Sequence, residues 1–384
     1  MDFDIVIAHG GMFRTDCGGG LRVFNIAKTL SLAGFNVAVV TPRYCGCEKF
    51  FNNVFRRYGV HIIPSTRYFN KGLYGQVLRA KFTILKAKDI VEKYGAKLQV
   101  EHSTLGGFST LFGCRNFILD IHDLEFDGPL YSRYPLFSKF IGWLENRAVN
   151  YAEKIVVVSS NMKKYLEFEW GIPEDNISVV PNGCSSTLLT LSEDLANLKS
   201  GGDIDPAVSV SFVGVFTHNV DYNKVIALAK AIKPIKIFMI GDGPKYSYFI
   251  NLVRRYRLNN IVCTGKLTEE ILIKFLANTS VCINPRVNDF HTFVSFGVKN
   301  LYYAALKRAI VMDADGSADI FKCAKAAKVT NSPQNVSEFI KYVIELLDSR
   351  DSGKALGYNA YNLAKKMTWE KVCRKFISLY DGEI

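Results

Sequence analysis

The chain has 384 residues, a formal net charge of +12, 48% hydrophobic residues and 22% charged residues. This length exceeds one compact core and fits two domains, and no segment approaches the roughly 18 consecutive apolar residues of a membrane-spanning helix. The nine cysteines lack the spacing of a zinc site or a redox pair, and the acidic-flanked first strand does not resemble a signal peptide. We therefore expect a cytoplasmic protein with reduced thiols and no metal site.

The positive charge is concentrated between residues 43 and 88, where ten basic residues accompany a single acid, Glu48. Aromatic residues are interspersed among them. Such a composition is typical of a surface that binds an anionic membrane or a nucleic acid, and equally of a solvated basic face whose aromatic residues belong to the core. Because the sequence contains no nucleic-acid-binding motif, we expect an anionic membrane surface rather than nucleic acid as the partner of 43–88.

The chain opens with a strand at 3–8, a glycine-rich loop containing Gly18, Gly19 and Gly20, a helix at 21–33 and a strand at 37–41. Glycines between a strand and a helix allow a ligand to approach the backbone closely. Their spacing is not GxGxxG, and no acidic residue ends the second strand. These two departures disfavour a nicotinamide dehydrogenase.

Two histidines follow successive predicted strands. Strand 98–100 leads to His102, and strand 117–121 leads to His122 and Asp123. The carboxyl ends of parallel strands are where open α/β sheets bind ligands. A role in ligand binding and a purely structural role are about equally supported for the pair.

The remaining elements of the first half are helices and strands at 78–94, 137–151, 154–158 and 177–180. A polar, glycine-rich stretch at 192–206 predicts a linker. The second half predicts strands at 210–213, 236–240, 261–264, 281–284 and 309–312. Its predicted helices lie at 222–232, 245–257, 268–278, 298–305, 337–347 and 369–380. The alternation predicts an α/β protein with two doubly wound, Rossmann-like domains facing across a cleft.

The stretch 282–311 is the most informative one in the second half. Its strand is broken by Pro285, and a polar loop turns at Gly297 into a helix that begins near Val298. A helix start presents free N–H groups and a positive dipole end, which attract phosphate, and Lys299 adds a positive charge. The alternative is an ordinary strand–loop–helix connection.

Several segments in this order resemble the retaining glycosyltransferases of the GT-B fold, family 4 type. In the first half these segments are GGGLRVFNIAKTLSLAGFNVAVVTP, IHDLEF, ENRAVNYAEKIVVVSSNMKKYL and GIPEDNISVVPNG. In the second half they are FVG, MIGDGP, NIVCTGKLTEEIL, the stretch 282–311 and MTWEKVCRKFISLY.

The resemblance implies an acceptor-binding domain at 1–192, a nucleotide-sugar-binding domain at 207–365, and a last helix at 366–384 that returns to the first domain. It assigns His122 and Lys299 to catalysis, and His102 and Asp123 to acceptor binding. The donor-binding residues that it implies are Gly19, Gly20, Gly214, Asn219, Lys224, Gly241, Gly243, Lys266, Arg286, Gly297, Val298 and Tyr302. It implies a retaining transfer that needs no protein nucleophile, no metal and no cofactor, the nucleotide-sugar being a substrate.

The chain departs from the family at the residues that usually hold the donor. Val294 and Tyr302 stand where the family has two glutamates, one for the sugar and one for the ribose. Val215 and Val220 replace an Arg and Lys pair that often binds the diphosphate. His218, Asn219 and Lys224 are the possible substitutes for that pair.

Three functions are consistent with these residues. The first is a transferase, peripheral to the inner face of a membrane, that moves a hexose from a nucleotide-sugar to a glycan or polyprenyl-linked acceptor. The second is a catalytically degenerate module that binds a partner protein or a glycan. The third is a nucleotide-sugar epimerase, which is disfavoured because it needs carboxylates as acid and base, and the two glutamates expected at Val294 and Tyr302 are absent.

Overall fold

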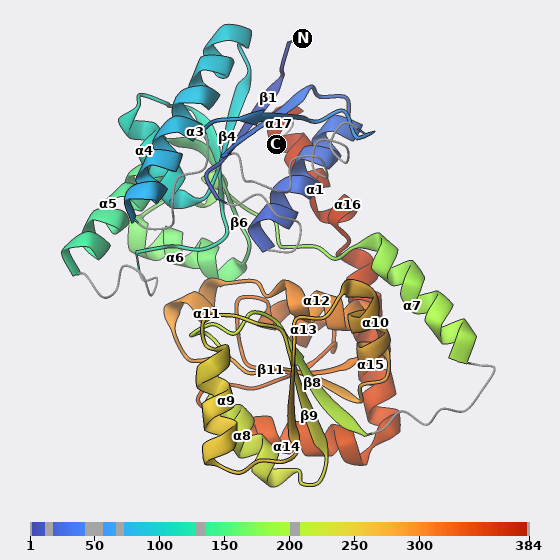
Figure 1. Cartoon of the computed structure of the whole chain (residues 1–384). Helices are drawn as coiled ribbons and strands as arrows, with labels where there is room; N and C mark the ends of the chain where they lie inside the picture. Colours follow the sequence, from blue (N-terminus) through green and yellow to red (C-terminus); the bar gives the residue numbers. More distant parts are fainter. Residues whose placement is uncertain are drawn as a thin grey trace. The chain divides into compact units, whose positions relative to one another are not determined.

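A computed structural model describes residues 2–11, 18–42, 57–66, 73–126, 135–199 and 208–381. The chain forms two compact units, Met1–Asn182 with Trp369–Ile384, and Gly183–Thr368 (Figure 1). Each unit consists of a parallel sheet with helices, which confirms the predicted pair of doubly wound α/β domains. The boundary lies at Asn182 rather than at residue 192.

Within the described residues, seven parallel strands form the sheet of the first unit in the order β3-β2-β1-β4-β5-β6-β7. They are β1 (Ile5–His9), β2 (Val37–Thr41), β3 (His61–Pro64), β4 (Lys97–Glu101), β5 (Phe117–Ile121), β6 (Ala152–Val157) and β7 (Ile177–Val179). The strand order reverses between β1 and β4, so the carboxyl ends of these strands border the position where such sheets bind ligands. The apolar residues of β1, β2 and β5 are buried on both faces, as expected for parallel strands.

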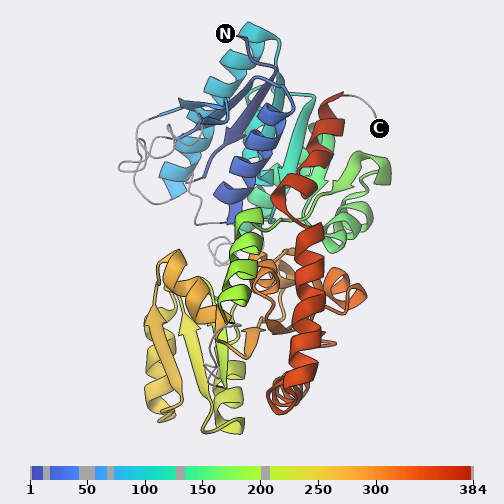
Figure 2. The same ribbon diagram turned by 90° about the vertical axis from the view of Figure 1, so that its right-hand side faces the viewer.

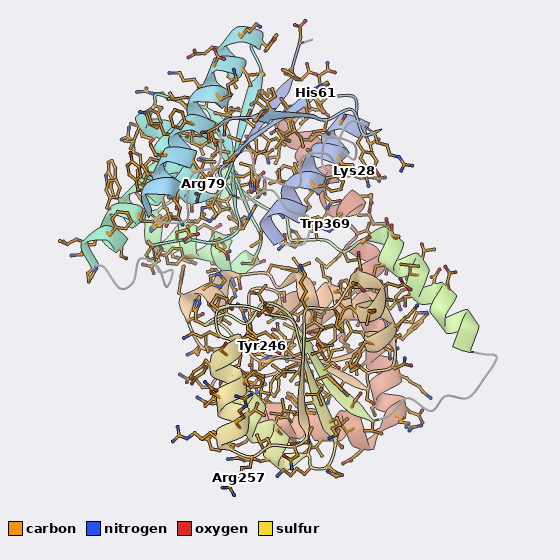
Figure 3. All side chains as sticks on the ribbon, in the orientation of Figure 1. Lys28, His61, Arg79, Tyr246, Arg257 and Trp369 are labelled. Atoms are coloured by element: carbon orange, nitrogen blue, oxygen red, sulfur yellow. The ribbon has the colours of Figure 1, made fainter. Side chains whose placement is uncertain are left out.

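The helices of the first unit are α1 (Gly18–Leu32), α3 (Leu73–Tyr94), α4 (Ser103–Leu111), α5 (Pro135–Tyr151), α6 (Ser160–Trp170), α16 (Trp369–Val372) and α17 (Arg374–Asp381). Helix α1 buries Val23, Ile26, Ala27 and Leu30, which recur at helical spacing. It packs beside α16 and α17, the short red helices next to the blue one in Figure 2. Side chains link these elements too, because Lys28 of α1 pairs with Glu370 at 3.3 Å, next to Trp369 (Figure 3).

The second unit contains a six-stranded parallel sheet in the order β10-β9-β8-β11-β12-β13, counted over the described residues. Its strands are β8 (Ser209–Val213), β9 (Lys236–Ile240), β10 (Ile261–Gly265), β11 (Val281–Asn284), β12 (Ala309–Met312) and β13 (Lys328–Val329). Its helices are α7 (Ser186–Lys199), α8 (Tyr222–Ala231), α9 (Tyr246–Arg255), α10 (Glu269–Ala277), α11 (Phe290–Val294), α12 (Val298–Ala305), α13 (Ala318–Cys323), α14 (Val336–Asp348) and α15 (Arg350–Lys366). The strand order reverses between β8 and β11.

Some sequence expectations are wrong. The predicted linker at 192–206 begins inside helix α7, and its part beyond residue 199 includes residues outside the described ranges. The predicted last helix is divided at Cys373 into α16 and α17, and residues 366–368 belong to the second unit. The polar composition of 192–199 misled the prediction because a helix also carries polar residues on its exposed side, as Glu193 and Asp194 show.

Most of the basic segment 43–88 that motivates a membrane partner lies outside the described residues, at 43–56 and 67–72. Its described parts include β3 and most of α3. Among the helices that the structure describes, none is long and apolar enough to cross a membrane.

Candidate functional site

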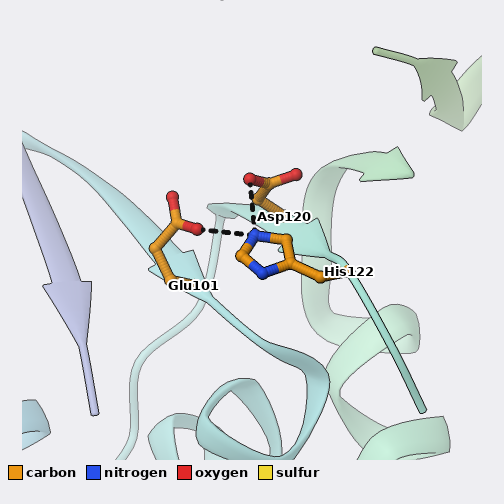
Figure 4. Close-up of side chains that lie close together, drawn as sticks. All are labelled: Glu101, Asp120 and His122. Carbon is orange, nitrogen blue, oxygen red and sulfur yellow. Dashed lines mark hydrogen bonds and ion pairs between the residues drawn. The ribbon is translucent and has the colours of Figure 1, made fainter. Parts of the chain in front are cut away.

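A cluster of ionisable side chains lies at the carboxyl ends of β4 and β5 in the first unit (Figure 4). Parallel pairing places Glu101 of β4 opposite Asp120 of β5, and His122 follows β5 directly. The His122 Nε2 atom lies 3.0 Å from Glu101 Oε2 and 3.2 Å from Asp120 Oδ2. Both carboxylates are almost fully buried, while the His122 side chain is 15% exposed. One edge of the His122 ring is therefore accessible, whereas the two carboxyl groups are not.

A buried arginine completes this cluster. Arg22 of α1 is 1% exposed and donates two hydrogen bonds to Asp120, from Nε at 2.7 Å and from Nη2 at 2.8 Å. Its Nη1 atom donates to the Pro181 carbonyl at 3.2 Å. The bidentate geometry is the strongest that an arginine and a carboxylate can form. It links α1, β5 and the end of the segment that follows β7.

The network continues to the C-terminal helices. Gln99 Nε2 donates to Glu101 Oε1 at 2.6 Å, and the Tyr380 hydroxyl donates to Gln99 Oε1 at 2.6 Å. Tyr380 belongs to α17 and is buried. Helix α17 thus helps to fix the carboxylate that contacts His122.

Glu101, Asp120 and His122 each have a shifted pKa. Burial lowers the pKa of His122, but the charges of Asp120 and Glu101 outweigh it and raise that pKa to about 9. Burial and the neighbouring Asp120 raise the pKa of Glu101 to about 7. Burial opposes ionisation of Asp120, yet Arg22 and His122 hold the pKa of this carboxyl well below its usual range. At neutral pH His122 therefore carries a proton between the two carboxylates.

Glu101, Asp120 and His122 also offer three possible metal-ligand atoms within 4.8 Å of one another. The two oxygens of Asp120 already accept hydrogen bonds from Arg22, and the His122 proton lies where a cation would be bound. Arg22 and His122 thus already supply the positive charge that faces Glu101 and Asp120. The arrangement fits an ion-pair network better than a metal site.

The glycines that open α1 lie beside His122. A Cβ atom added at Gly19 would be 3.6 Å from His122 Nδ1, the ring nitrogen opposite the one that contacts the carboxylates. The neighbouring Gly20 is buried. The structure therefore brings the predicted residues Gly19, Gly20 and His122 together at the start of α1.

His102 and Asp123 lie close to the same strand ends. His102 Nε2 is 3.4 Å from Glu125 Oε1, and the charge of Glu125 overcomes burial to raise the pKa of His102. The backbone at His102 has φ 93°, a strained value for a residue other than glycine. The buried Glu145 accepts hydrogen bonds from Ser103, Thr104 and the Glu125 and Phe126 N–H groups, which fixes the loop after β5. Acceptor binding by His102 and Asp123 stays a prediction.

In the second unit, the loops after β8 and β11 are joined to each other. Val220 and Arg286 form an isolated antiparallel bridge, and the Val287 N–H donates to the Asn219 carbonyl at 3.1 Å. The Asn219 Nδ2 atom lies 2.7 Å from His291 Nδ1. The predicted donor residues Asn219 and Arg286 are therefore neighbours at the strand-order reversal of this sheet.

Lys224 does not lie where the sequence interpretation placed it. Its side chain is fully buried, with Nζ 2.5 Å from Asp313 Oδ2 and 2.6 Å from the Pro333 carbonyl. Asp313 Oδ2 also accepts the Arg286 N–H at 2.7 Å. Because α8 turns Lys224 into the core, it supports the loop that carries Arg286 rather than contacting a donor.

Lys299 lies in the first turn of α12, whose N-cap residue, Gly297, forms no side-chain capping bond. Its Nζ atom lies 4.5 Å from the centroid of the Phe212 ring. A Cβ atom on Gly214 would approach Nζ to 3.0 Å, so Gly214 leaves the space that the ammonium occupies. Burial and the nearby Arg286 lower the pKa of Lys299 to about 7, against the opposing charge of Asp315. Gly214, Gly297, Val298 and Lys299 thus form one positively charged corner with Arg286 nearby.

Buried polar atoms without a hydrogen-bond partner are concentrated around this corner. Within the described part of the chain they include Asn219 Oδ1, Asn284 Oδ1, Arg286 Nε, Thr292 Oγ1, Asn300 Oδ1 and the Tyr302 hydroxyl. A buried polar atom that lacks a partner costs roughly 1–3 kcal/mol. Their concentration in the loop after β11 and in α12 is typical of a surface that binds a polar ligand.

The other predicted donor residues have different surroundings. A Cβ on Gly241 would collide with the Gly214 carbonyl, and one on Gly243 would lie 2.7 Å from the Phe216 backbone, so close packing between two loops requires both glycines. Lys266 is exposed after β10. Val294, at a position where the family has glutamate, is fully buried.

The sequence interpretation gave no site role to Arg22, Glu101, Asp120, Asp313 or Asp315. Asp315 is 3% exposed and accepts hydrogen bonds from the N–H and hydroxyl of Ser317. A charged residue inside an otherwise apolar segment, as in LDIHD or GGLRVFNIA, was the available signal. This sequence signal identifies charged residues that are buried, but it does not identify the residues with which they pair.

The two units have the architecture of GT-B glycosyltransferases. Residues 17–187 match the family profile described as "Glycosyltransferase Family 4", and residues 203–363 match the one described as "Glycosyl transferases group 1". The chain belongs to this family of glycosyltransferases, which confirms the resemblance seen in the sequence.

The individual proteins that resemble this chain share only a small part of its sequence. An uncharacterised glycosyltransferase of Methanocaldococcus jannaschii is 23% identical over 370 residues, covering 94% of this chain and 93% of that protein. Sucrose-phosphate synthase from Thermosynechococcus elongatus has a similar structure, with a TM-score of 0.75, 16% identity and 98% of each chain covered. HepE of Anabaena, solved with UDP-glucose, gives a TM-score of 0.72 at 14% identity, covering 99% of this chain and 100% of that one. At these identities the structural likeness establishes the fold.

Proposed function

We propose that this glycosyltransferase transfers a hexose from a nucleotide-sugar, with retention of configuration and without a metal or cofactor. We further propose a glycan or polyprenyl-linked acceptor, at the cytoplasmic face of a membrane. The observation that carries the donor part is the group of unpartnered buried polar atoms around the uncapped start of α12. HepE, a protein of the same fold, binds UDP and UDP-glucose, which supports a nucleotide-sugar as the donor class.

The proposed chemistry requires few side chains. When the bond between sugar and diphosphate breaks, negative charge develops on phosphate oxygens, and the Lys299 ammonium with the N–H groups that open α12 would stabilise it. The acceptor hydroxyl passes its proton to the departing phosphate on the same face of the sugar, which retains the anomeric configuration. His122 Nδ1, beside Gly19, would donate a hydrogen bond to the transferred sugar.

The test is a panel of UDP-, GDP- and ADP-sugars, read by thermal shift and by donor hydrolysis. We expect a single base to raise the melting temperature and its sugar-nucleotide to be slowly hydrolysed. A shift without any hydrolysis or transfer would favour a degenerate module that retains a nucleotide. No shift with any donor would contradict the proposal, and the loss of both family glutamates, at Val294 and Tyr302, would then favour a module for a partner protein or a glycan.

Tyr302 offers a sharper test of how the donor is held. Its hydroxyl is buried without a partner, at the position where the family has the ribose-binding glutamate. If the hydroxyl binds the ribose, Tyr302→Phe is expected to weaken donor binding by about three- to tenfold. Titration calorimetry with the donor identified above measures this change.

The matched control is Tyr358→Phe, which removes a hydroxyl from a side chain that is 60% exposed. Its donor affinity should equal that of the unmodified protein. Equal affinities for all three proteins would show that the Tyr302 hydroxyl makes no contact with the donor.

A further inference from the structure

Helix α5 of the first unit exposes large apolar side chains along one face. Leu136 is 84% exposed, Phe140 is 42% exposed and Trp143 is 49% exposed. Their spacing of four and three residues places them in one row. The buried side of the same helix contributes Ile141 and Leu144 to a hydrophobic cluster. The row is therefore additional apolar surface that the core does not use.

The aromatic members of this row form a preorganised surface. The Phe140 and Trp143 rings are stacked with centroids 5.9 Å apart, and Phe137 lies 6.0 Å from Phe140. The Ser138 hydroxyl donates to the Phe126 carbonyl at 2.6 Å, which anchors the first turn of the helix. Aromatic rings that already pack against one another lose little conformational freedom when they bind a partner surface.

Basic residues flank the row. Lys139 is exposed within the same face, and the Arg147 guanidinium lies 5.8 Å from the Trp143 ring centroid. Arg115, in the loop between α4 and β5, lies 5.5 Å from the ring centroid of Tyr151, the last residue of α5. Lys139 and Arg147 thus place positive charge beside the apolar row.

The acidic residue of α5 does not lie on this exposed face. Across Pro135–Tyr151 the sequence contains one acidic residue, Glu145, which is fully buried and accepts four hydrogen bonds. The exposed face of α5 thus combines apolar side chains with positive charge and lacks negative charge. A surface of this composition is chemically complementary to the headgroup region of an anionic membrane, where tryptophan is enriched.

Self-association is a less suitable explanation for this surface. Two copies that met symmetrically through α5 would bring Lys139 and Arg147 of both chains close together, and like charges would repel. An anionic lipid surface complements the same residues.

We propose that the α5 face, defined by Leu136, Lys139, Phe140 and Trp143, docks the first unit onto an anionic lipid bilayer. This inference deepens the proposed membrane-surface action and rests on it only in the choice of partner. It is independent of residues 43–56 and 67–72. The apolar side chains would enter the headgroup region while Lys139 contacts lipid phosphates.

The test is co-sedimentation of the full chain with vesicles of phosphatidylcholine mixed with phosphatidylglycerol. The double variant Phe140→Ser/Trp143→Ser is expected to lower the partition coefficient by about tenfold or more. The matched control is Leu32→Ser/Tyr358→Ser, which removes side chains that are 66% and 60% exposed elsewhere. Lys139→Gln should weaken binding, whereas Lys354→Gln, with the same change in net charge, should not.

Thermal unfolding and donor hydrolysis in solution are measured on the same proteins. An unchanged melting temperature would show that a variant that loses docking is still folded. Unchanged donor hydrolysis would show that the loss of docking is independent of the proposed transfer. Equal partition of all variants would overturn the proposal, as would binding to pure phosphatidylcholine vesicles that equals binding to the mixed ones. A concentration-dependent dimer in sedimentation velocity that the double variant abolishes, without vesicle binding, would also overturn it in favour of a second copy.

Discussion

Replacement of Asp120 by asparagine is expected to lower the free energy of unfolding of the first unit by about 3–5 kcal/mol. The change preserves the shape of the side chain but removes the charge that Arg22 pairs with. Arg22 is 1% exposed, so its guanidinium would remain buried without a compensating anion. His122 would lose the same partner. Urea denaturation followed by circular dichroism measures the loss.

The control is Asp175→Asn, which removes a charge from an exposed aspartate of the same unit. It should change the unfolding free energy by less than about 0.5 kcal/mol. The double variant Arg22→Met/Asp120→Leu should recover much of the loss, because two apolar side chains replace a buried pair without leaving an unpaired charge. A loss below about 1 kcal/mol for Asp120→Asn would show that the pair behaves like an exposed salt bridge.

The second large effect is expected at Lys299. Lys299→Ala should lower kcat/KM for the nucleotide-sugar by about 10²–10³-fold, the range observed when one preorganised group that stabilises developing negative charge is removed. Lys341→Ala, at a lysine whose side chain is 71% exposed in α14, is the matched control and should leave kcat/KM unchanged.

A pH profile separates this role from a structural one. Because the pKa of Lys299 is lowered to about 7, the free protein loses the ammonium as the pH rises above this value. The diphosphate binds the charged form better, so donor affinity should fall as the pH increases from about 7 toward the ordinary lysine value. Lys299→Arg, which stays charged, should remove this dependence. A pH dependence that persists in Lys299→Arg would contradict the assignment.

The alternation of elements could be predicted because it depends on local patterns. Strands β9, β11 and β12 are mainly apolar runs bounded by polar or glycine residues, and β5 is apolar except for Asp120. The predicted ranges of all four strands agree with the structure. Strand β3 and helix α4 were missed. HIIP in β3 is short, and the glycine-rich STLGGFSTL of α4 has little helical periodicity.

Site residues could be predicted only where they stand beside a recognisable local feature, such as a strand end or the start of a helix. Gly297 and Lys299 follow from the loop that opens α12, and His122 follows from a strand end. The partners of Asp120 could not be predicted, because Arg22 is 98 residues away and only the packing of α1 on the sheet brings the two together. Lys224 shows the opposite error, since a cation near a loop was assigned to a ligand although α8 turns it toward Asp313.

The chain passes from the first unit to the second at Asn182 and returns at Thr368. The two ends of the second unit meet, because Cys184 and Thr368 form a bridge and the Cys184 N–H donates to the Met367 carbonyl at 2.9 Å. The second unit is thus a continuous insertion that can fold on the ribosome as soon as its residues emerge. The first unit is complete only after α16 and α17 are synthesised, because Tyr380 of α17 donates a hydrogen bond to Gln99. During biosynthesis, the first unit is therefore the one whose synthesis starts first and whose fold is completed last.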